Sequence, residues 1–386
     1  MKIVYIFKSF AMLAGTERVL TDKMNYLAHK GYDVYVITYE QGEHPYAYYL
    51  HTSIHRIDLN ECFFRIGKYN FFKKLIVYRK MKIGFRKKLK ITLSDINPDI
   101  LICTTYSLRI INDIFKASNN VKCKIIESHV SINSIFKRND FSKFNPLYYA
   151  SYWMDNNAMK ILKKFNKVIV LTNKESKLWV NNGIKPLIIN NPTTYYPSEY
   201  KEPQNNHTIL CVGRLESQKG FDLLINAWSK IYSKYKDWHI NIYGNGGLKS
   251  ILERQIIETI NNDSVRIFNP VQNIYDKYND ADFFVLSSRA EGFGLVLAEA
   301  MSCGRPCVSF NCPYGPDEII TDGVDGLLAK NGDVDDLAEK MEWMITHDKE
   351  RKEMGLRARE SAKRYDKEKI MAQWINLFNE FKRNKN

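Results

Sequence analysis

Short apolar runs alternate with segments of helical periodicity along most of the chain. The runs are rich in β-branched and aromatic side chains, which predicts buried strands. The segments between them carry apolar side chains at helical spacing, which predicts helices packed on a sheet. Strands that alternate with helices indicate parallel sheets with right-handed crossovers, and hence an α/β fold. The predicted strands are residues 2–7, 33–39, 55–59, 99–105, 124–130, 167–171, 208–212, 238–243, 265–271 and 282–286.

The length of 386 residues favours two domains. Residues 195–207 are polar and contain Pro197 and Pro203, so we interpret them as a linker. We therefore expect an N-terminal domain over residues 1–192 and a C-terminal domain over residues 207–366. An amphipathic pattern over residues 368–381 predicts one further helix.

The stretch 287–304, which reads SSRAEGFGLVLAEAMSCG, joins the last predicted strand to a helix that begins near Leu295. Gly292 and Gly294 carry no Cβ, so a ligand can approach the backbone closely. The helix N-terminus offers unpaired N–H groups and a partial positive charge. This combination predicts a binding site for a phosphate or a diphosphate.

Two carboxylates flank the predicted phosphate site. Glu291 and Glu299 are suited to accept hydrogen bonds from hydroxyl groups, such as those of a ribose or a sugar. A phosphate site beside two such acids fits a nucleotide-sugar. The alternative is that Glu291 complements the helix dipole and that Glu299 is a solvated helix residue.

Two cations follow the predicted strand 208–212. Arg214 and Lys219 are placed to bracket a diphosphate, Arg214 through a two-pronged contact and Lys219 as a point charge. The alternative is a pair of solvated cations on a loop. Gly15, between the first strand and the first helix, marks a second possible phosphate site, with a plain strand-to-helix turn as the alternative.

His129 lies at the carboxyl end of the predicted strand 124–130. Ligands of α/β proteins usually bind where parallel strands end, which makes His129 a candidate site residue. Taken alone, a histidine in this position is more often a packed or a surface residue.

The spacing of Glu291 and Glu299, with Gly292, Gly294 and the continuation to Pro306, resembles the signature of retaining GT-B glycosyltransferases of family 4 (glycosyl transferases group 1). Residues 213–220, 311–320 and 322–328 also resemble that family. The similarity covers essentially the whole chain, with dense motifs only from 213 to 328. It implies two doubly wound Rossmann-like domains facing a cleft. The C-terminal domain would bind the nucleotide-sugar, the N-terminal domain would bind the acceptor, and a helix over about 367–386 would pack back on the N-terminal domain.

The resemblance also implies residue roles. Two positions depart from the family pattern: Ala14 replaces a glycine, and Val130 stands where an asparagine is common after the histidine. The resemblance further implies retention at the anomeric carbon and a reaction that requires no metal. It also implies a UDP-linked sugar as the donor and a bacterial surface polysaccharide or lipid-linked glycan as the product. The implied catalytic residues are His129, Glu291, Arg214 and Lys219, and the implied donor-binding residues are Gly15, Arg214, Lys219, Glu291, Gly292, Phe293, Gly294, Leu295 and Glu299.

The charge balance favours anionic partners. The chain has 57 Lys and Arg against 43 Asp and Glu, a formal net charge of +14, but no recognised nucleic-acid motif. Residues 68–90 contain ten Lys or Arg and no acid, interleaved with apolar residues. A basic amphipathic helix is typical of contact with an anionic membrane surface or acceptor. The alternative is a solvated helix whose apolar side packs on its own domain.

The seven cysteines are an odd number scattered over the chain, which favours reduced thiols and a cytoplasmic location, with peripheral attachment to the inner face of the membrane through 68–90. No apolar stretch is long enough to predict a membrane-spanning helix. The spacing of Cys303, Cys307 and Cys312 is not a zinc pattern, and we expect no metal at Asp280-Ala-Asp282.

Two other functions remain open from the sequence. One is a GT-B enzyme with different chemistry, such as sugar-nucleotide epimerisation. The other is a non-enzyme, a basic protein that binds RNA or an anionic surface.

Overall fold

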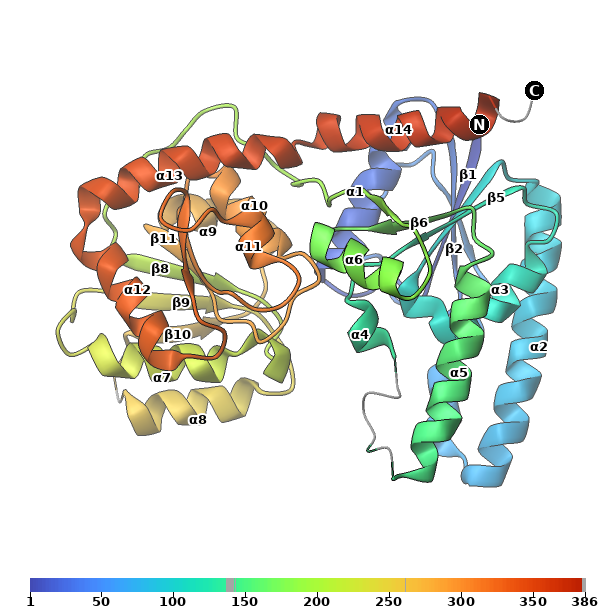
Figure 1. The fold of residues 1–386 in the computed structure, drawn as a ribbon, viewed down its shortest axis with the longest axis horizontal. Coiled ribbons are helices and arrows are strands. Elements are labelled where there is room, and N and C mark those ends of the chain that lie inside the picture. Colours follow the sequence, from blue (N-terminus) through green and yellow to red (C-terminus); the bar gives the residue numbers. More distant parts are fainter. Residues whose placement is uncertain (137–141, 143, 261, 384–386) are drawn as a thin grey trace. The chain divides into compact units, whose positions relative to one another are not determined.

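The computed structural model describes residues 1–136, 142, 144–260 and 262–383. The chain divides into two compact units (Figure 1). Unit 1 comprises residues 1–189 and 371–386, and unit 2 comprises residues 190–370. Each unit is built on its own parallel sheet.

Unit 1 contains a seven-stranded sheet in the order β3-β2-β1-β4-β5-β6-β7, with all neighbours parallel. The strands are β1 (Lys2–Phe7), β2 (Asp33–Thr38), β3 (His55–Asp58), β4 (Ile100–Thr104), β5 (Cys123–Glu127), β6 (Lys167–Val170) and β7 (Leu187–Ile188). The helices are α1 (Gly15–His29), α2 (Phe71–Ile96), α3 (Ile111–Ala117), α4 (Ile132–Ile135), α5 (Pro146–Leu162) and α6 (Asn173–Asn181), with short 3-10 helices η1 (Phe63–Lys68) and η2 (Thr105–Ile110).

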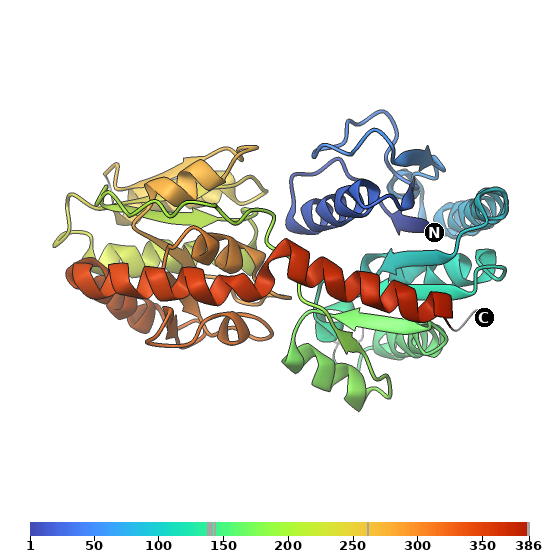
Figure 2. The same cartoon turned by 90° about the horizontal axis from the view of Figure 1, so that it is seen from above.

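Central strands of unit 1 are buried on both faces, because helices cover both sides of a parallel sheet. All five residues of β4 and of β5 are buried. The helices α2, α3 and α5 contribute to one core with alternate residues of the sheet, such as Val4 and Leu101. The part of the helix α14 (Lys367–Arg383) that belongs to unit 1 packs on α1, where Nζ of Lys23 lies 3.5 Å from the centroid of the Trp374 ring (Figures 1 and 2).

Unit 2 contains a six-stranded parallel sheet in the order β10-β9-β8-β11-β12-β13. The strands are β8 (Thr208–Val212), β9 (His239–Tyr243), β10 (Val265–Phe268), β11 (Phe283–Leu286), β12 (Cys307–Phe310) and β13 (Gly326–Ala329). The helices are α7 (Phe221–Ile231), α8 (Lys249–Thr259), α9 (Tyr275–Asp280), α10 (Leu295–Ser302), α11 (Pro316–Ile319), α12 (Val334–Thr346) and α13 (Asp348–Ala362), with η4 (Ser217–Lys219) and η5 (Lys363–Tyr365).

Both sheets reverse their strand order near the middle. The reversal falls between β1 and β4 in unit 1 and between β8 and β11 in unit 2. Such switch points leave space between diverging loops at the carboxyl ends of the strands, where α/β proteins bind ligands. The loops that follow β8 and β11 carry Lys219 and Glu291, so the sequence motifs fall at the switch point of unit 2.

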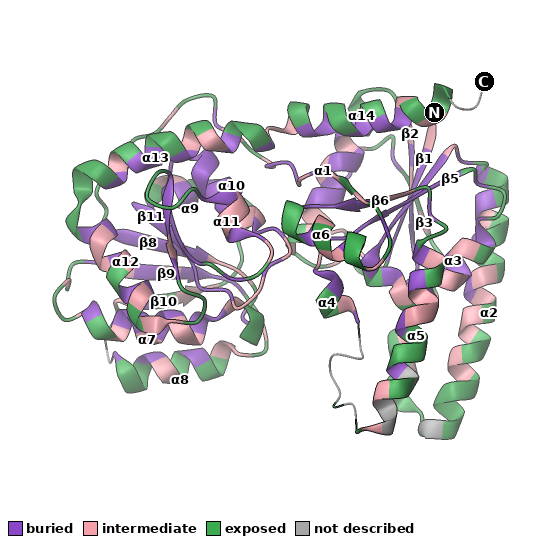
Figure 3. Ribbon diagram, viewed as in Figure 1, coloured by how far each residue is buried: buried purple, intermediate pink, exposed green. Residues whose placement is uncertain are grey.

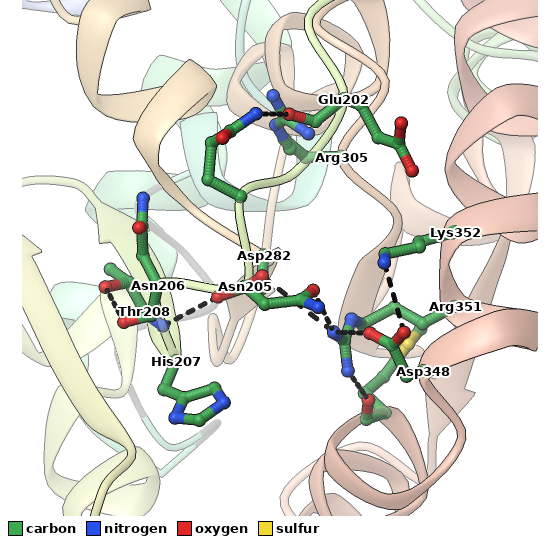
Figure 4. Close-up of polar contacts among 12 residues, drawn as sticks. Glu202, Asn205, Asn206, His207, Thr208, Asp282, Arg305, Asp348, Arg351 and Lys352 are labelled. Carbon is green, nitrogen blue, oxygen red and sulfur yellow. Dashed lines mark hydrogen bonds and ion pairs between the residues drawn. The ribbon is translucent and has the colours of Figure 1, made fainter.

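The predicted linker is part of unit 2. The backbone carbonyl of Pro197 accepts a hydrogen bond from Arg359, and that of Lys201 accepts one from Arg305 at 2.7 Å. Figure 4 shows the continuation of this segment next to a buried arginine, Arg351 of α13, which approaches Asn205 at 3.4 Å. Side chains from other elements therefore fix a polar segment that looks unstructured in sequence.

Candidate functional site

The loops after β8 and β11 touch through their backbones. Gly220 has φ +63°, and a Cβ at this position would lie 2.0 Å from the carbonyl oxygen of Ser287. The hydroxyl of Ser287 donates to the carbonyl of Lys219 at 3.0 Å, and the N–H of Arg289 donates to the carbonyl of Gln218 at 2.8 Å. A side chain at position 220 would separate the two loops, so glycine is required there.

Lys219 and Glu291 meet across these loops. The Nζ of Lys219 lies 2.7 Å from Oε1 of Glu291, and the hydroxyl of Ser288 donates to the same oxygen at 2.5 Å. Glu291 is buried and Lys219 is mostly buried. Glu291 is therefore not a solvated carboxylate near a helix end, and two of the predicted site residues form one charged pair.

Arg214 does not take part in the pair formed by Lys219 and Glu291. Its side chain is about half exposed and pairs with Glu216, with 3.0 Å between NH1 and Oε2. Arg214 and Lys219 lie on the same loop, but their side chains engage different carboxylates. Exposed ion pairs contribute little to stability, so Arg214 can exchange Glu216 for an anionic ligand at small cost.

The N-terminus of α10 lies directly after Glu291. Gly294 precedes the helix with φ +92°, and no side chain caps the first N–H groups. The predicted donor-binding residues at this helix end differ in how far they are exposed. Gly292 and Leu295 are partly exposed, whereas Phe293 is buried with its ring edge against Tyr365, with 5.3 Å between centroids. Phe293 can therefore offer a ligand its backbone but not its ring.

Glu299 is buried inside unit 2, so it is not the solvated helix residue of the alternative interpretation. It accepts hydrogen bonds from the hydroxyl groups of Tyr278 at 3.1 Å and Tyr275 at 3.4 Å, both from α9. Burial and the charge of Glu299 raise the pKa of Tyr278 well above its ordinary value, so the hydroxyl remains a donor. Neither tyrosine was predicted from the sequence. Their i, i+3 spacing before the strand β11 is the one local signal that could have suggested them.

In unit 1, Gly15 begins α1. No side chain caps the N-terminus of α1, and a Cβ at Gly15 would meet nothing within 4 Å. Packing therefore does not require a glycine at position 15.

His129 follows β5 by two residues and is buried. Its Nε2 lies 3.2 Å from Oε2 of Glu127, which also contacts Nζ of Lys23 at 2.6 Å. His129 is thus a packed residue with a charged neighbour at the carboxyl end of its strand. Glu127 and Lys23 were not predicted as partners from the sequence, because Lys23 lies 104 residues before Glu127.

We searched the described residues for side chains that could bind a metal ion. No group of three or more His, Cys, Asp or Glu there could hold a metal ion. Asp282, from the Asp-x-Asp sequence, is buried, accepts the N–H of Thr208 at 2.9 Å and lies 3.8 Å from Arg351 (Figure 4). Within the described part of the chain, no helix is both long and apolar enough to cross a bilayer.

Sequence comparisons find similarity to glycosyltransferases. The family profile of glycosyl transferases group 1 matches residues 194–361, which lie within unit 2. An uncharacterized glycosyltransferase of Haemophilus influenzae is 28% identical over 97% of this chain and 98% of its own length. The amylovoran biosynthesis glycosyltransferase AmsD of Erwinia amylovora is 24% identical over 98% of this chain and 99% of its own length.

Solved structures show the same fold. Sucrose-phosphate synthase of Thermosynechococcus elongatus aligns with a TM-score of 0.79 at 19% identity, over 98% of both chains. HepE of Anabaena in complex with UDP and glucose aligns with a TM-score of 0.75 at 18% identity, over 98% of this chain and 99% of that one. The fold is GT-B, as predicted. The match to the glycosyl transferases group 1 profile is confined to residues of unit 2. The names of these relatives favour neither the epimerase nor the RNA-binding alternative.

Proposed function

We propose that this protein transfers a sugar from a UDP-sugar to a hydroxyl group of a glycan or lipid-linked acceptor, with retention at the anomeric carbon, during synthesis of a bacterial surface polysaccharide. The observation that carries the proposal is the buried pair of Lys219 and Glu291 beside the uncapped N-terminus of α10. A cation and free N–H groups suit a diphosphate, and a carboxylate suits sugar hydroxyls.

The charge that develops in this reaction lies on the departing diphosphate. Lys219, Arg214 and the N–H groups after Gly294 would stabilise it by preorganised electrostatics, with no metal required. The bond from the anomeric carbon to the phosphate oxygen breaks, the acceptor oxygen bonds on the same face, and the acceptor proton passes to the phosphate. Glu291 and His129 would bind the sugar, and Glu299 would bind the ribose.

The choice of UDP rests on the relatives. HepE of Anabaena forms a complex with UDP and glucose, and the fold of this chain is the same. AmsD acts in amylovoran biosynthesis by its name, which supports a surface polysaccharide as the product class.

A transfer assay tests the proposal. The purified protein is incubated with UDP-glucose, UDP-galactose or UDP-N-acetylglucosamine and a lipid-linked glycan extract, in the presence of EDTA. We expect acceptor-dependent release of UDP and a product whose anomeric configuration by proton NMR equals that of the donor. An inverted product contradicts retention, and activity that appears only with added manganese contradicts metal independence. If none of these donors supports transfer, the proposal of a UDP-sugar as the donor is contradicted.

We also propose a peripheral membrane location at the inner face of the cytoplasmic membrane, through α2. From Phe85 onward the apolar face of α2 packs on unit 1, with Leu89 and Leu93 also fully buried. Near its N-terminus the apolar residues are exposed instead: Leu75 by 54% and Ile76 by 71% (Figure 3). The C-terminal part of α2 therefore packs on its own domain, and the exposed apolar residues near its N-terminus support the proposed membrane contact.

Basic residues accompany the exposed apolar ones on α2. Attraction to an anionic leaflet is worth about 1 kcal/mol for each basic residue near the surface. Exposed apolar side chains near the helix end could insert between lipids while the cations contact headgroups. A hollow of about 440 Å³ beside α2 carries four cations and no acid, and it is lined by Ile83, Arg86, Lys87, Lys90, Lys116 and Asn119.

Co-sedimentation with vesicles tests this location. We expect binding to vesicles that contain phosphatidylglycerol, weakened by salt and by the double substitution Leu75→Ser/Ile76→Ser. The matched control is Ile251→Ser/Ile257→Ser on α8, where the two residues are 59% and 67% exposed. Equal binding of both double variants, or no binding at low salt, contradicts membrane contact through α2.

A further inference from the structure

Unit 1 contains a fully buried ion pair near its switch point. Lys23 on α1 and Glu127 at the end of β5 lie 2.6 Å apart, and each side chain is 2% exposed. The ring of Trp374 on α14 covers Lys23, with Nζ 3.5 Å from the ring centroid. Three elements distant in sequence therefore enclose one pair of charges.

Such a pair is poorly explained by stability alone. Replacement of a buried ion pair by apolar residues of similar volume is often neutral or stabilising, because two charges have lost their hydration. Burial alone would raise the pKa of Glu127, but the charge of Lys23 and the contact with His129 outweigh it and lower that pKa below its ordinary value. Glu127 is therefore an anion at neutral pH, and the imidazole of His129 lies against it.

The two nitrogens of His129 have different surroundings. Nε2 lies 3.2 Å from the oxygen of Glu127 that also contacts Lys23, within ion-pair distance but without the alignment of a hydrogen bond. Nδ1 is buried and has no hydrogen-bond partner among the residues that the structure describes. A buried nitrogen without a partner points to a ligand or water at Nδ1.

Other unpaired polar atoms lie close by. Thr104 ends β4 and pairs in register with Glu127 on the neighbouring strand. The hydroxyl groups of Thr104 and Thr105 and the Oε1 atom of Glu127 are also buried without a partner among the described residues. The carboxyl ends of β4 and β5 thus carry several hydrogen-bonding groups suited to a polyhydroxylated ligand.

We propose that Glu127, anchored by Lys23, is a positioning residue that holds the Nε2–H of His129 and so leaves Nδ1 to accept a hydrogen bond from a hydroxyl of the sugar. This inference rests on the proposed function for the identity of the ligand. The arrangement of Glu127 and His129 itself does not depend on it. A carboxylate that fixes one imidazole nitrogen determines which proton-bearing form the other nitrogen takes.

The first test is an NMR spectrum of the full-length protein labelled with ¹⁵N at histidine. We expect an Nε2–H resonance at low field that exchanges slowly with water and disappears in His129→Gln. It disappears as well in Lys23→Met/Glu127→Leu, which removes both charges together and so leaves no buried charge alone. The control is Glu175→Gln, a buried glutamate of unit 1 that accepts from Trp179 at 2.9 Å. Persistence of the resonance in the double variant, or a proton found on Nδ1 in the wild type, overturns the proposal.

If the double variant does not fold, the single variant Glu127→Gln tests the contact between Glu127 and His129 instead. A neutral amide oxygen is a weaker acceptor than a carboxylate, so the resonance should move to higher field. An unchanged resonance in Glu127→Gln contradicts the contact.

The second test uses UDP-N-acetylglucosamine and UDP-glucose as probes, with UDP alone as the reference. We expect a sugar-bearing probe to move the Nδ1 resonance of His129 and UDP not to do so. Binding by calorimetry without any change at Nδ1 overturns the role of His129 as an acceptor. Absence of binding by every nucleotide-sugar contradicts the proposed function, whereas the first test judges the contact of Glu127 with His129 by itself.

Turnover separates positioning from a general effect on folding. We expect Glu127→Gln to lower kcat about 10- to 100-fold with little change in KM, because a misplaced group mainly affects the transition state. In a His129→Ala background, the same substitution should have no further effect. Equal losses in both backgrounds would mean that Glu127 does not act through His129.

Discussion

Lys219 Nζ lies 2.7 Å from Glu291 Oε1, and this contact joins the loops that follow the two strands at the switch point of unit 2. Both groups also belong to the proposed reaction, Lys219 toward the diphosphate and Glu291 toward the sugar. Their mutual contact keeps each side chain in place, so the charges are organised before a donor binds.

Substitution Lys219→Gln should lower kcat about 100- to 1,000-fold, because one charge that stabilises the departing diphosphate is lost. Steady-state release of UDP from the donor measures the effect. Lys234→Gln is the control, since Lys234 is 63% exposed and pairs with Glu342 on the surface of the same unit. Similar kcat values for both variants would exclude Lys219 from the reaction.

Substitution Glu299→Gln should raise the dissociation constant for UDP about 10-fold or more, because a hydrogen bond to a carboxylate is stronger than one to an amide. The amide retains the shape of the side chain between Tyr275 and Tyr278, so the fold should persist. Calorimetric titration measures the constant, with the exposed residue Glu253→Gln on α8 as the control. Undiminished affinity in Glu299→Gln would argue against a ribose contact at this carboxylate.

Substitution Gly220→Ala should destabilise the protein by about 1–3 kcal/mol or more, because Gly220 has φ +63° and its Cβ would overlap the carbonyl of Ser287. Chemical denaturation with urea measures the change. The matched control is Gly247→Ala, since a Cβ at position 247 would meet nothing within 4 Å. Equal stability of the two variants would show that the loops can separate without cost.

The bidentate contact of Arg289 with Asp222, at 2.8 and 2.6 Å, should make stability depend on acid pH. Hydrogen bonds from Arg289 lower the pKa of Asp222 below its ordinary value of about 3.9. The folded state therefore binds fewer protons in this range, and the contribution is full above about pH 5 and disappears as pH falls through the folded pKa.

The matched measurement is the free energy of unfolding of wild type and Asp222→Asn between pH 3 and pH 7. The difference between them should be largest near neutrality and shrink as pH falls. Asp335→Asn, which loses only an exposed pair with Lys230, controls for a surface ion pair. A difference that stays constant across the range would contradict the linkage.

The seven cysteines should resist thiol reagents in the folded protein. All are free and buried, and burial raises the pKa of Cys303 and of Cys312 to about 12. Thiolates are the reactive form, so almost none is present at pH 8. Titration with a chromogenic disulfide should detect less than about one thiol before denaturation and seven after it. Rapid reaction of several thiols in the native protein would contradict this packing.

The strands were predicted best where apolar runs are continuous. Residues 2–7 and 208–212 were predicted with the bounds of β1 and β8. The helix α1 begins at Gly15, where Ala14 offers no capping side chain that could mark the start in sequence. The strands β12 and β13 were not predicted.

The site was predictable where its residues share one loop or helix. The loop 287–294 and Glu299 follow from local spacing, and so does Lys219. Contacts between distant segments were not predictable, such as those of Tyr278 with Glu299 and of Lys23 with Glu127, because no short pattern encodes them. The hydrogen bonds that hold the predicted linker were not predictable either, since the arginines that donate them lie about a hundred residues or more further along the chain.

The most direct test of nucleotide-sugar binding is the thermal stability of the protein in EDTA with UDP, GDP or ADP. A ligand at 100 times its dissociation constant adds about 2.7 kcal/mol to the free energy of unfolding, which is readily measured. We expect UDP to raise the melting temperature of the wild type, and to raise that of Glu299→Gln by clearly less. A shift with GDP or ADP instead of UDP would contradict uracil as the base of the donor. No shift with any of the three nucleotides would contradict a nucleotide site in unit 2.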